Sequence, residues 1–261
     1  MLTVEHIHVS LAGASVLKGV SLEAEPGQVT VIVGPNGSGK TTLLRAMTQD
    51  LPYQGSVRLD GTDISSLPGW KLASRRAVLP QASRIAFPFT VLEIVRLGLM
   101  SGATAAPDTR ASEALARVGL AGFEGRYYQE LSGGEQQRTQ LARVLCQAWE
   151  PVGDDGPRWL FLDEPVSSLD IGHQLEVMDL MSDYTLRGGG TIAVMHDLNL
   201  TAMYAQKVIL LSEGTCIASG PPEAVLTDTM LSRAYGCALR VNAAPPAPAT
   251  YLLPHMARRA G

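Results

Sequence analysis

Apolar residues recur along the chain with two different spacings, and each spacing predicts one kind of element. The strongest short runs, VTVIV at 29–33 and WLFL at 159–162, have the length and composition of buried strands. Weaker strand patterns occupy residues 2–9, 16–24, 55–59, 77–80, 191–195, 207–211 and 215–219. Helical spacing occupies residues 41–50, 90–100, 109–119, 132–149, 174–184, 198–205, 222–226 and 229–235. Because strands and helices alternate over most of the chain, we expect an α/β fold with a mostly parallel sheet covered by helices.

Two segments interrupt this alternation. Residues from about 85 to 150 contain three expected helices and no strand, which predicts a helical subdomain inserted into the α/β core. Near the end of the chain, AAPPAPA at 243–249 is rich in proline and alanine and is typical of a linker or an irregular tail. We therefore expect one domain at 1–240 and a tail at 241–261.

The stretch GPNGSGKTT at 34–42 lies between a predicted strand and a predicted helix and fits the pattern G-x-x-x-x-G-K-[ST]. Glycines permit positive φ angles, so successive N–H groups can curl around a phosphate, and the helix directs the positive end of its dipole at the same anion. In such a loop the lysine bridges the β- and γ-phosphates, and the threonine hydroxyl binds Mg²⁺. The nucleotide-binding residues expected here are Gly34, Pro35, Asn36, Gly37, Ser38, Gly39, Lys40, Thr41 and Thr42.

A second predicted strand ends in carboxylates, as the other half of a phosphoryl-transfer site should. In WLFLDE, Asp163 stands at the strand end and can hold Mg²⁺ through water. Glu164 follows and can orient or deprotonate an attacking water. An isolated Asp-Glu pair at a strand end is more often structural, but the phosphate loop requires such a partner.

The segment LSGGEQQR at 131–138 opens another predicted helix. Ser132, Gly133 and Gly134, followed by Glu135, form a second set of backbone donors at a helix N-terminus. One nucleotide does not need two such sets on the same chain. We therefore expect this segment to serve a nucleotide held by a second copy of the chain, in a homodimer.

Together these motifs resemble those of the ATP-binding subunits of ABC transporters, over about residues 1–240. GPNGSGKTT resembles their Walker A loop, LSGGE their signature, and WLFLDE their Walker B strand with its catalytic glutamate. The resemblance implies a P-loop NTPase (RecA-like) core with an N-terminal antiparallel β-subdomain and the inserted α-helical subdomain. It also implies ATP and Mg²⁺ as ligands.

Three further matches follow in the order that this family shows. Gln81 in VLPQ resembles the Q-loop glutamine, which would sense Mg²⁺ and the transmembrane partner. Asp170 in SSLD resembles the D-loop residue at the dimer seam, and His196 in VMHD resembles the switch histidine, which would contact the γ-phosphate. The resemblance thus implies Lys40, Glu164 and His196 as catalytic residues. The metal site that it implies consists of Thr41, Gln81 and Asp163.

The chain departs from the family pattern at one position. The family usually places an aromatic residue in the first hairpin, where it stacks on adenine. In VSLAGASVL that position is Leu11, so we expect adenine to rest on aliphatic surface from Leu11 and Val16.

Composition limits the partners. The 21 Lys and Arg against 25 Asp and Glu give a formal net charge of −4, which provides no general basic field for nucleic acid. The three cysteines are odd in number and far apart, which is typical of a reducing compartment. No apolar run approaches the roughly 20 residues of a membrane-spanning helix, so we expect any membrane role to come through a partner.

Further resemblance narrows the type of transporter. The segment VLEIVRLGLM and the region that begins MHDLNLT are similar to the ATPases of importers for haem, siderophores and cobalamin, and the loop EPVGDDGPRW is similar to the haemin branch. The implied function is an ATPase that energises haem uptake from the cytoplasmic face of a bacterial inner membrane. Its implied partners are a permease dimer and, indirectly, a periplasmic substrate-binding protein. The alternatives are a ferric-siderophore or cobalamin importer, an exporter subunit, and a non-transport ABC ATPase of DNA repair or translation.

Overall fold

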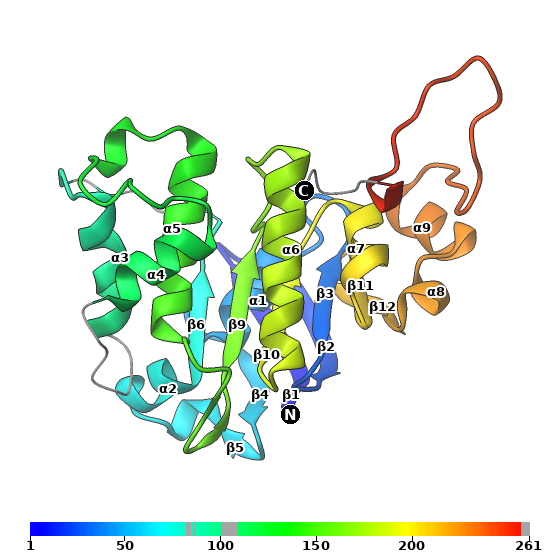
Figure 1. Ribbon diagram of the computed structural model, residues 1–261. Coiled ribbons are helices and arrows are strands. Elements are labelled where there is room, and N and C mark those ends of the chain that lie inside the picture. Colours follow the sequence, from blue (N-terminus) through cyan, green and yellow to red (C-terminus); the bar gives the residue numbers. More distant parts are fainter. Residues whose placement is uncertain (82–84, 86, 101–108, 257–261) are drawn as a thin grey trace.

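A six-stranded sheet forms the centre of the computed structural model, which describes residues 1–81, 85, 87–100 and 109–256 (Figure 1). Its strand order is β12-β11-β3-β10-β9-β6. The strands are β3 (Val29–Val33), β6 (Arg76–Leu79), β9 (Trp159–Asp163), β10 (Gly190–Val194), β11 (Lys207–Ser212) and β12 (Thr215–Gly220). All neighbours pair in parallel except β12, which runs antiparallel to β11. The prediction of a mostly parallel sheet is confirmed.

An antiparallel sheet of order β2-β1-β4-β5 lies beside the central sheet. It consists of β1 (Leu2–Leu11), β2 (Ala14–Ala24), β4 (Gln54–Leu59) and β5 (Thr62–Asp63). Helix α1 (Lys40–Met47) shares a hydrophobic core with both sheets through Leu43, Leu44 and Met47. The helix that follows the phosphate loop is therefore held on both sides by apolar contacts.

Residues along each central strand alternate between two separate cores. On β9, Leu160 and Leu162 belong to the core beneath the helical layer, whereas Trp159 and Phe161 belong to the core shared with α1 and the antiparallel sheet. All four side chains are fully buried. Because both faces of the strand are covered, it needs a continuous apolar run, and this explains WLFL.

The helical layer divides into three groups in Figure 1. Helices α3, α4 and α5 stand together at one end of the sheet, α6 crosses its middle, and α7, α8 and α9 cover the other end. Their bounds are α3 (Val91–Met100), α4 (Arg110–Arg117), α5 (Gly133–Gln147), α6 (Ile171–Leu186), α7 (Leu198–Tyr204), α8 (Pro222–Val225) and α9 (Asp228–Tyr235). None of the helices within the described ranges combines the length and the apolarity that crossing a bilayer requires.

Several elements differ from the sequence expectations. Helix α6 begins three residues earlier than expected, because the Asp170 carboxylate caps it by accepting a hydrogen bond from the His173 N–H at 3.0 Å. Helix α2 (Gly69–Arg75) was not expected, and the loop after α5 contains a small hairpin of β7 (Val152–Gly153) and β8 (Gly156–Pro157). Short 3₁₀ turns lie at Ile64–Ser66, Tyr128–Glu130 and Pro254–Met256. The residues between the expected helices at 90–100 and 109–119 lie outside the described residues.

The C-terminal segment is irregular over most of its described length. Residues 241–253 contain no helix or strand, and the turn at Pro254–Met256 returns to the surface of α7. The segment is attached where the Val241 N–H donates to the Asp228 carboxylate at 2.6 Å. The division into a domain at 1–240 and a tail at 241–261 stays a prediction.

The contact between α3 and α5 depends on a glycine. A Cβ added at Gly98 would lie 2.1 Å from the carbonyl oxygen of Arg143 and 3.0 Å from the Cβ of Cys146. In an open helix, Gly→Ala stabilises by about 1 kcal/mol, but overpacking against backbone costs about 1–3 kcal/mol. We expect Gly98→Ala to lower the free energy of unfolding by about 1–2 kcal/mol, measured by urea denaturation.

Gly69→Ala provides the matched control, because Gly69 begins α2 and an added Cβ there meets no atom within 4 Å. It should leave the stability unchanged or raise it slightly. Equal stability of the two variants would contradict the close approach of α3 and α5.

Candidate nucleotide-binding site

The carboxyl ends of four neighbouring parallel strands meet at one edge of the central sheet. Gln81 follows β6, and His196 follows β10. Asp163 is the last residue of β9 and Glu164 comes next, while the glycine loop follows β3. Open parallel sheets bind ligands at this edge. A pocket of about 280 Å³ lies here and is lined by Val16, Asn36, Gly37, Gly39, Lys40, Thr41, Thr42, Gln81, Glu164 and His196. The fold therefore gathers, in one place, predicted residues that are up to 180 positions apart.

The loop between β3 and α1 requires glycine for two different reasons. Gly34, Gly37 and Gly39 all have positive φ angles, of 150°, 77° and 100°. In addition, a Cβ at Gly34 would lie 2.1 Å from the carbonyl oxygen of Leu211, and one at Gly39 would lie 2.7 Å from the Leu17 side chain. The loop is thus held tightly against its surroundings while its backbone curves around the pocket.

Lys40 begins α1 and is only 7% exposed. Its Nζ donates to the carbonyl oxygens of Gly34 at 2.8 Å and of Pro35 at 2.9 Å, so the ammonium group lies across the loop. Burial lowers the pKa of Lys40, an effect that the nearby carboxylates of Glu164 and Asp163 oppose. A polyanion in the pocket would supply the countercharge that this buried cation favours.

Thr41 and Asp163 bring together the oxygen ligands that Mg²⁺ prefers. The Thr41 hydroxyl donates to Asp163 Oδ1 at 3.2 Å, and Asp163 is 2% exposed. Burial raises the pKa of Asp163, while the Thr41 hydrogen bond acts in the opposite direction. Because the ionised carboxylate is disfavoured by its burial, a cation bound beside it would stabilise it. The residues present therefore fit a magnesium ion.

The Glu164 carboxylate is the acceptor for two side chains from neighbouring strands. Its Oε1 accepts from Gln81 Nε2 at 2.9 Å and lies 2.7 Å from His196 Nε2. The backbone of Glu164 is left-handed, with φ of 52°, a conformation that costs a non-glycine residue about 1–2 kcal/mol. Backbone strain of this kind is characteristic of functional sites.

One residue in contact with this site was not among the predicted site residues. Gln137, in the first turns of α5, donates from Nε2 to the Glu164 carbonyl oxygen at 3.1 Å. Its only signal in the sequence is its place just after LSGGE, which says nothing about contact with a residue 27 positions away.

The predicted second set of donors lies outside this pocket. Ser132 caps α5 in a capping box with Glu135, whose carboxylate accepts from the Ser132 N–H at 2.7 Å and from its hydroxyl at 2.6 Å. Ser132 and Gly133 are exposed, and an added Cβ at Gly133 meets no atom within 4 Å. Gly134, in contrast, packs against the Ser168 carbonyl. The N-terminus of α5 is therefore open to an external ligand.

Of Val16, Leu11 and Asp170, which were also predicted, only Val16 lines the pocket. Leu11, at the end of β1, is 40% exposed and is not among the lining residues. The Asp170 side chain is 70% exposed and pairs with His173 Nδ1 at 2.8 Å. The contact of Leu11 with adenine and the place of Asp170 at a dimer seam stay predictions.

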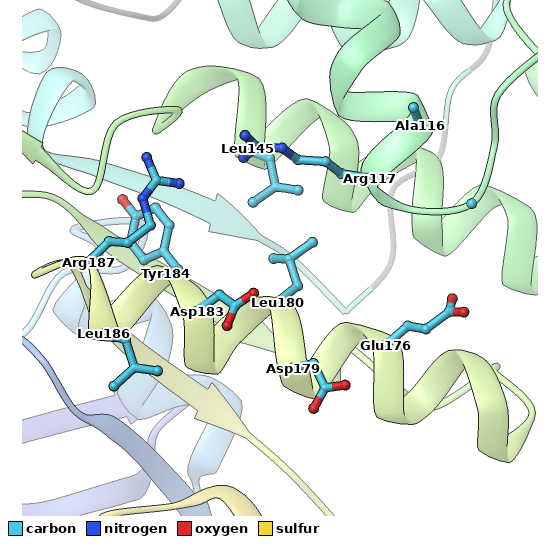
Figure 2. A pocket seen from close by; sticks show the side chains of 11 residues that line it. Ala116, Arg117, Leu145, Glu176, Asp179, Leu180, Asp183, Tyr184, Leu186 and Arg187 are labelled. Atoms are coloured by element: carbon cyan, nitrogen blue, oxygen red, sulfur yellow. The ribbon is translucent and has the colours of Figure 1, made fainter. Parts of the chain in front are cut away.

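A larger groove of about 670 Å³ lies elsewhere, where α4 and α5 meet α6 (Figure 2). Its lining combines Arg117 and Arg187 with the acidic residues Glu176, Asp179 and Asp183 of α6. It contains none of the motif residues. The larger of these two cavities is therefore not the candidate site, and the smaller pocket at the strand ends carries the phosphate-binding chemistry.

The fold and the phosphate loop are those of a P-loop NTPase. The model of the ABC transporter family matches residues 17–167. A "Hemin import ATP-binding protein HmuV" of Jannaschia sp. (strain CCS1) is 69% identical over 100% of this chain and 97% of that protein. A protein of the same name from Roseobacter denitrificans is 59% identical over 97% of each chain.

A solved structure described as the dimeric structure of a bacterial ABC transporter cassette is similar with a TM-score of 0.74. It is 26% identical to this chain and covers 85% of this chain and 99% of its own. The chain belongs to the ABC transporter family.

Removal of the Lys40 ammonium should abolish tight nucleotide binding. A hydrogen bond to a charged group contributes about 1.5–3 kcal/mol, so we expect Lys40→Ala to weaken Mg²⁺-ATP binding by about 100-fold. Binding of a fluorescent ATP analogue measures this. Lys71→Ala, on α2 and outside the pocket, is the control. Unchanged ATP affinity in Lys40→Ala would contradict the assignment of the loop.

Proposed function

We propose that the chain is the ATP-hydrolysing subunit of a bacterial ABC importer that energises haem uptake across the inner membrane. The observation that carries this proposal is the 69% identity, over the whole chain, to a protein named for hemin import. The geometry of the pocket supports the chemistry, because a buried lysine, the Glu164 carboxylate and a histidine line it beside a glycine loop, and Thr41 of its lining donates to Asp163.

Each side chain of the pocket has one task in the proposed reaction. The loop N–H groups and Lys40 bind the phosphates. Glu164 accepts a proton from the attacking water and aligns it. Gln81 and His196 hold the Glu164 carboxylate from two sides, and His196 also contacts the γ-phosphate. Thr41 and Asp163 would hold Mg²⁺ together with Gln81, and the ion, when bound, neutralises charge on the β- and γ-phosphates.

A second copy of the chain completes each site. The exposed Ser132 and Gly133 at the α5 N-terminus, together with Gly134 and with Glu135 fixing their conformation, would bind the γ-phosphate of a nucleotide held by the partner protomer. This proposal rests on the openness of that helix end and on the dimeric state of the similar cassette. ATP then joins the two protomers, and hydrolysis removes the shared charge.

The proposed permease contact lies on the segments that carry Phe87 and Tyr127. Phe87 is 70% exposed and Tyr127 is 49% exposed, and the two segments are joined where Thr90 pairs with Tyr127. Exposed aromatic side chains on two adjoining segments favour a protein partner at this surface. We place the chain at the cytoplasmic face of the inner membrane, bound to a permease dimer. A periplasmic substrate-binding protein would act on it only through that permease.

Loss of the proposed general base should separate binding from turnover. Positioned bases contribute about 10²–10⁴-fold, so Glu164→Gln should bind ATP and dimerise but hydrolyse at least about 100-fold more slowly. Phosphate release and size-exclusion chromatography with ATP measure the two properties. Glu223→Gln, exposed on α8 and remote from the pocket, is the control. Rapid turnover by Glu164→Gln would remove Glu164 from this role.

The transported substrate is tested in the assembled transporter. We expect ATP hydrolysis by this chain, in proteoliposomes with a coexpressed haem permease, to rise several-fold with haem-loaded periplasmic binding protein. The same liposomes with Glu164→Gln should show no rise. Siderophore- or cobalamin-loaded binding proteins, each with its own permease, should not stimulate hydrolysis. Stimulation by one of these and not by haem would reassign the substrate.

A further inference from the structure

The main chain of Glu164 is fixed on both sides of its strained conformation. Its N–H donates to the Val194 carbonyl oxygen of β10 at 3.0 Å. Its own carbonyl oxygen accepts from Gln137 Nε2 at 3.1 Å and from the Ser167 N–H at 3.3 Å. The strand neighbour thus fixes one end of the residue, and a side chain of α5 fixes the other.

The residue after Glu164 makes the Gln137 contact more important. Pro165 has no N–H, so the peptide group between the two residues has only a carbonyl with which to bind its surroundings. The orientation of that peptide group sets the ψ angle of Glu164, and the backbone conformation limits the rotamers through which the carboxylate can reach the pocket. Without Gln137, the carbonyl would keep, among the residues that the structure describes, only the long hydrogen bond from Ser167.

Helix α5 holds Gln137 at a fixed distance from this carbonyl. An added Cβ at Gly134 would lie 2.9 Å from the Ser168 carbonyl oxygen, so the first turn of α5 packs against the segment that follows Glu164. Gln137 lies one helical turn after Gly133, and helical side chains lean toward the N-terminus of their helix. The amide is thus presented from a rigid backbone, close to the exposed helix end.

We propose that Gln137 is a positioning residue that fixes the Glu164 main chain and so directs its carboxylate at the attacking water. This inference rests on the proposed role of Glu164. The same helix carries the exposed donors Ser132 and Gly133. Engagement of those donors by a nucleotide of the partner protomer would therefore be transmitted through Gln137 to Glu164 of this protomer.

The test compares Gln137→Leu with wild type in the full-length chain. The leucine has a similar volume but lacks the donor, so we expect kcat for ATP to fall about tenfold with KM and ATP affinity unchanged within twofold. Gln137→Glu keeps the length of the side chain and loses the donor, so its kcat should fall at least as far. Gln137→Lys, which keeps an N–H donor of similar reach, should recover most of the rate.

Gln147→Leu is the matched control on the same helix. Gln147 Nε2 also donates to two backbone carbonyl oxygens, of Ala73 and Arg76, each at 3.0 Å, but far from Glu164. Its loss should lower the melting temperature and leave kcat per folded molecule unchanged. Gln137→Leu should instead lower kcat and leave the melting temperature unchanged.

A double variant distinguishes positioning from general stability. If Gln137 acts through Glu164, then Gln137→Leu should slow the Glu164→Gln variant by less than twofold, because its target is already absent. A full tenfold loss in that background, or an unchanged kcat in Gln137→Leu alone, would overturn the inference while leaving Glu164 as the base. Rapid turnover by Glu164→Gln itself would overturn the role of Glu164 and this inference with it.

Discussion

Burial of both faces of the central sheet is the constraint on which the rest of the structure depends. Leu160 and Leu162 on one face of β9, and Trp159 and Phe161 on the other, leave no room for a polar side chain along the strand. The charged side chains of the central strands accordingly stand at strand ends. Since β6, β9, β10 and β3 are neighbours and run in parallel, their carboxyl ends place the chemistry at one edge.

The buried charges at that edge are balanced imperfectly by the protein itself. Burial lowers the pKa of Lys40 and raises the pKa of Asp163, so in each case desolvation outweighs the attraction between the two groups. Both shifts disfavour the charged form. A phosphate anion beside Lys40 and a metal cation beside Asp163 would reverse both effects. The site is therefore organised for a bound nucleotide before the nucleotide arrives, at some cost in stability of the chain alone.

The sequence was sufficient to predict most of the fold. The phosphate loop is a local motif, and each central strand lies within one or two residues of its expected bounds, because a strand buried on both faces leaves a strong apolar signal. Elements with weak local signals were missed. Helix α2 is short, and the β7–β8 hairpin has only two residues on each strand. The early start of α6 depends on a cap by Asp170, which the sequence presents only as part of another motif.

Long-range contacts account for what the sequence could not show. Glu164 is identified by its place after β9, but its conformation depends on Val194, Gln81 and His196, which reach it from two other strands, and on Gln137 from α5. No local pattern encodes these distances. Gln81 and His196 hold the carboxylate, Val194 holds the main-chain N–H, and Gln137 of α5 holds the main-chain carbonyl. In the proposed role of Gln137, a shift of α5 relative to the sheet would turn the Glu164 peptide group. Glu164 would then be the residue through which a movement of α5 changes the direction of the carboxylate.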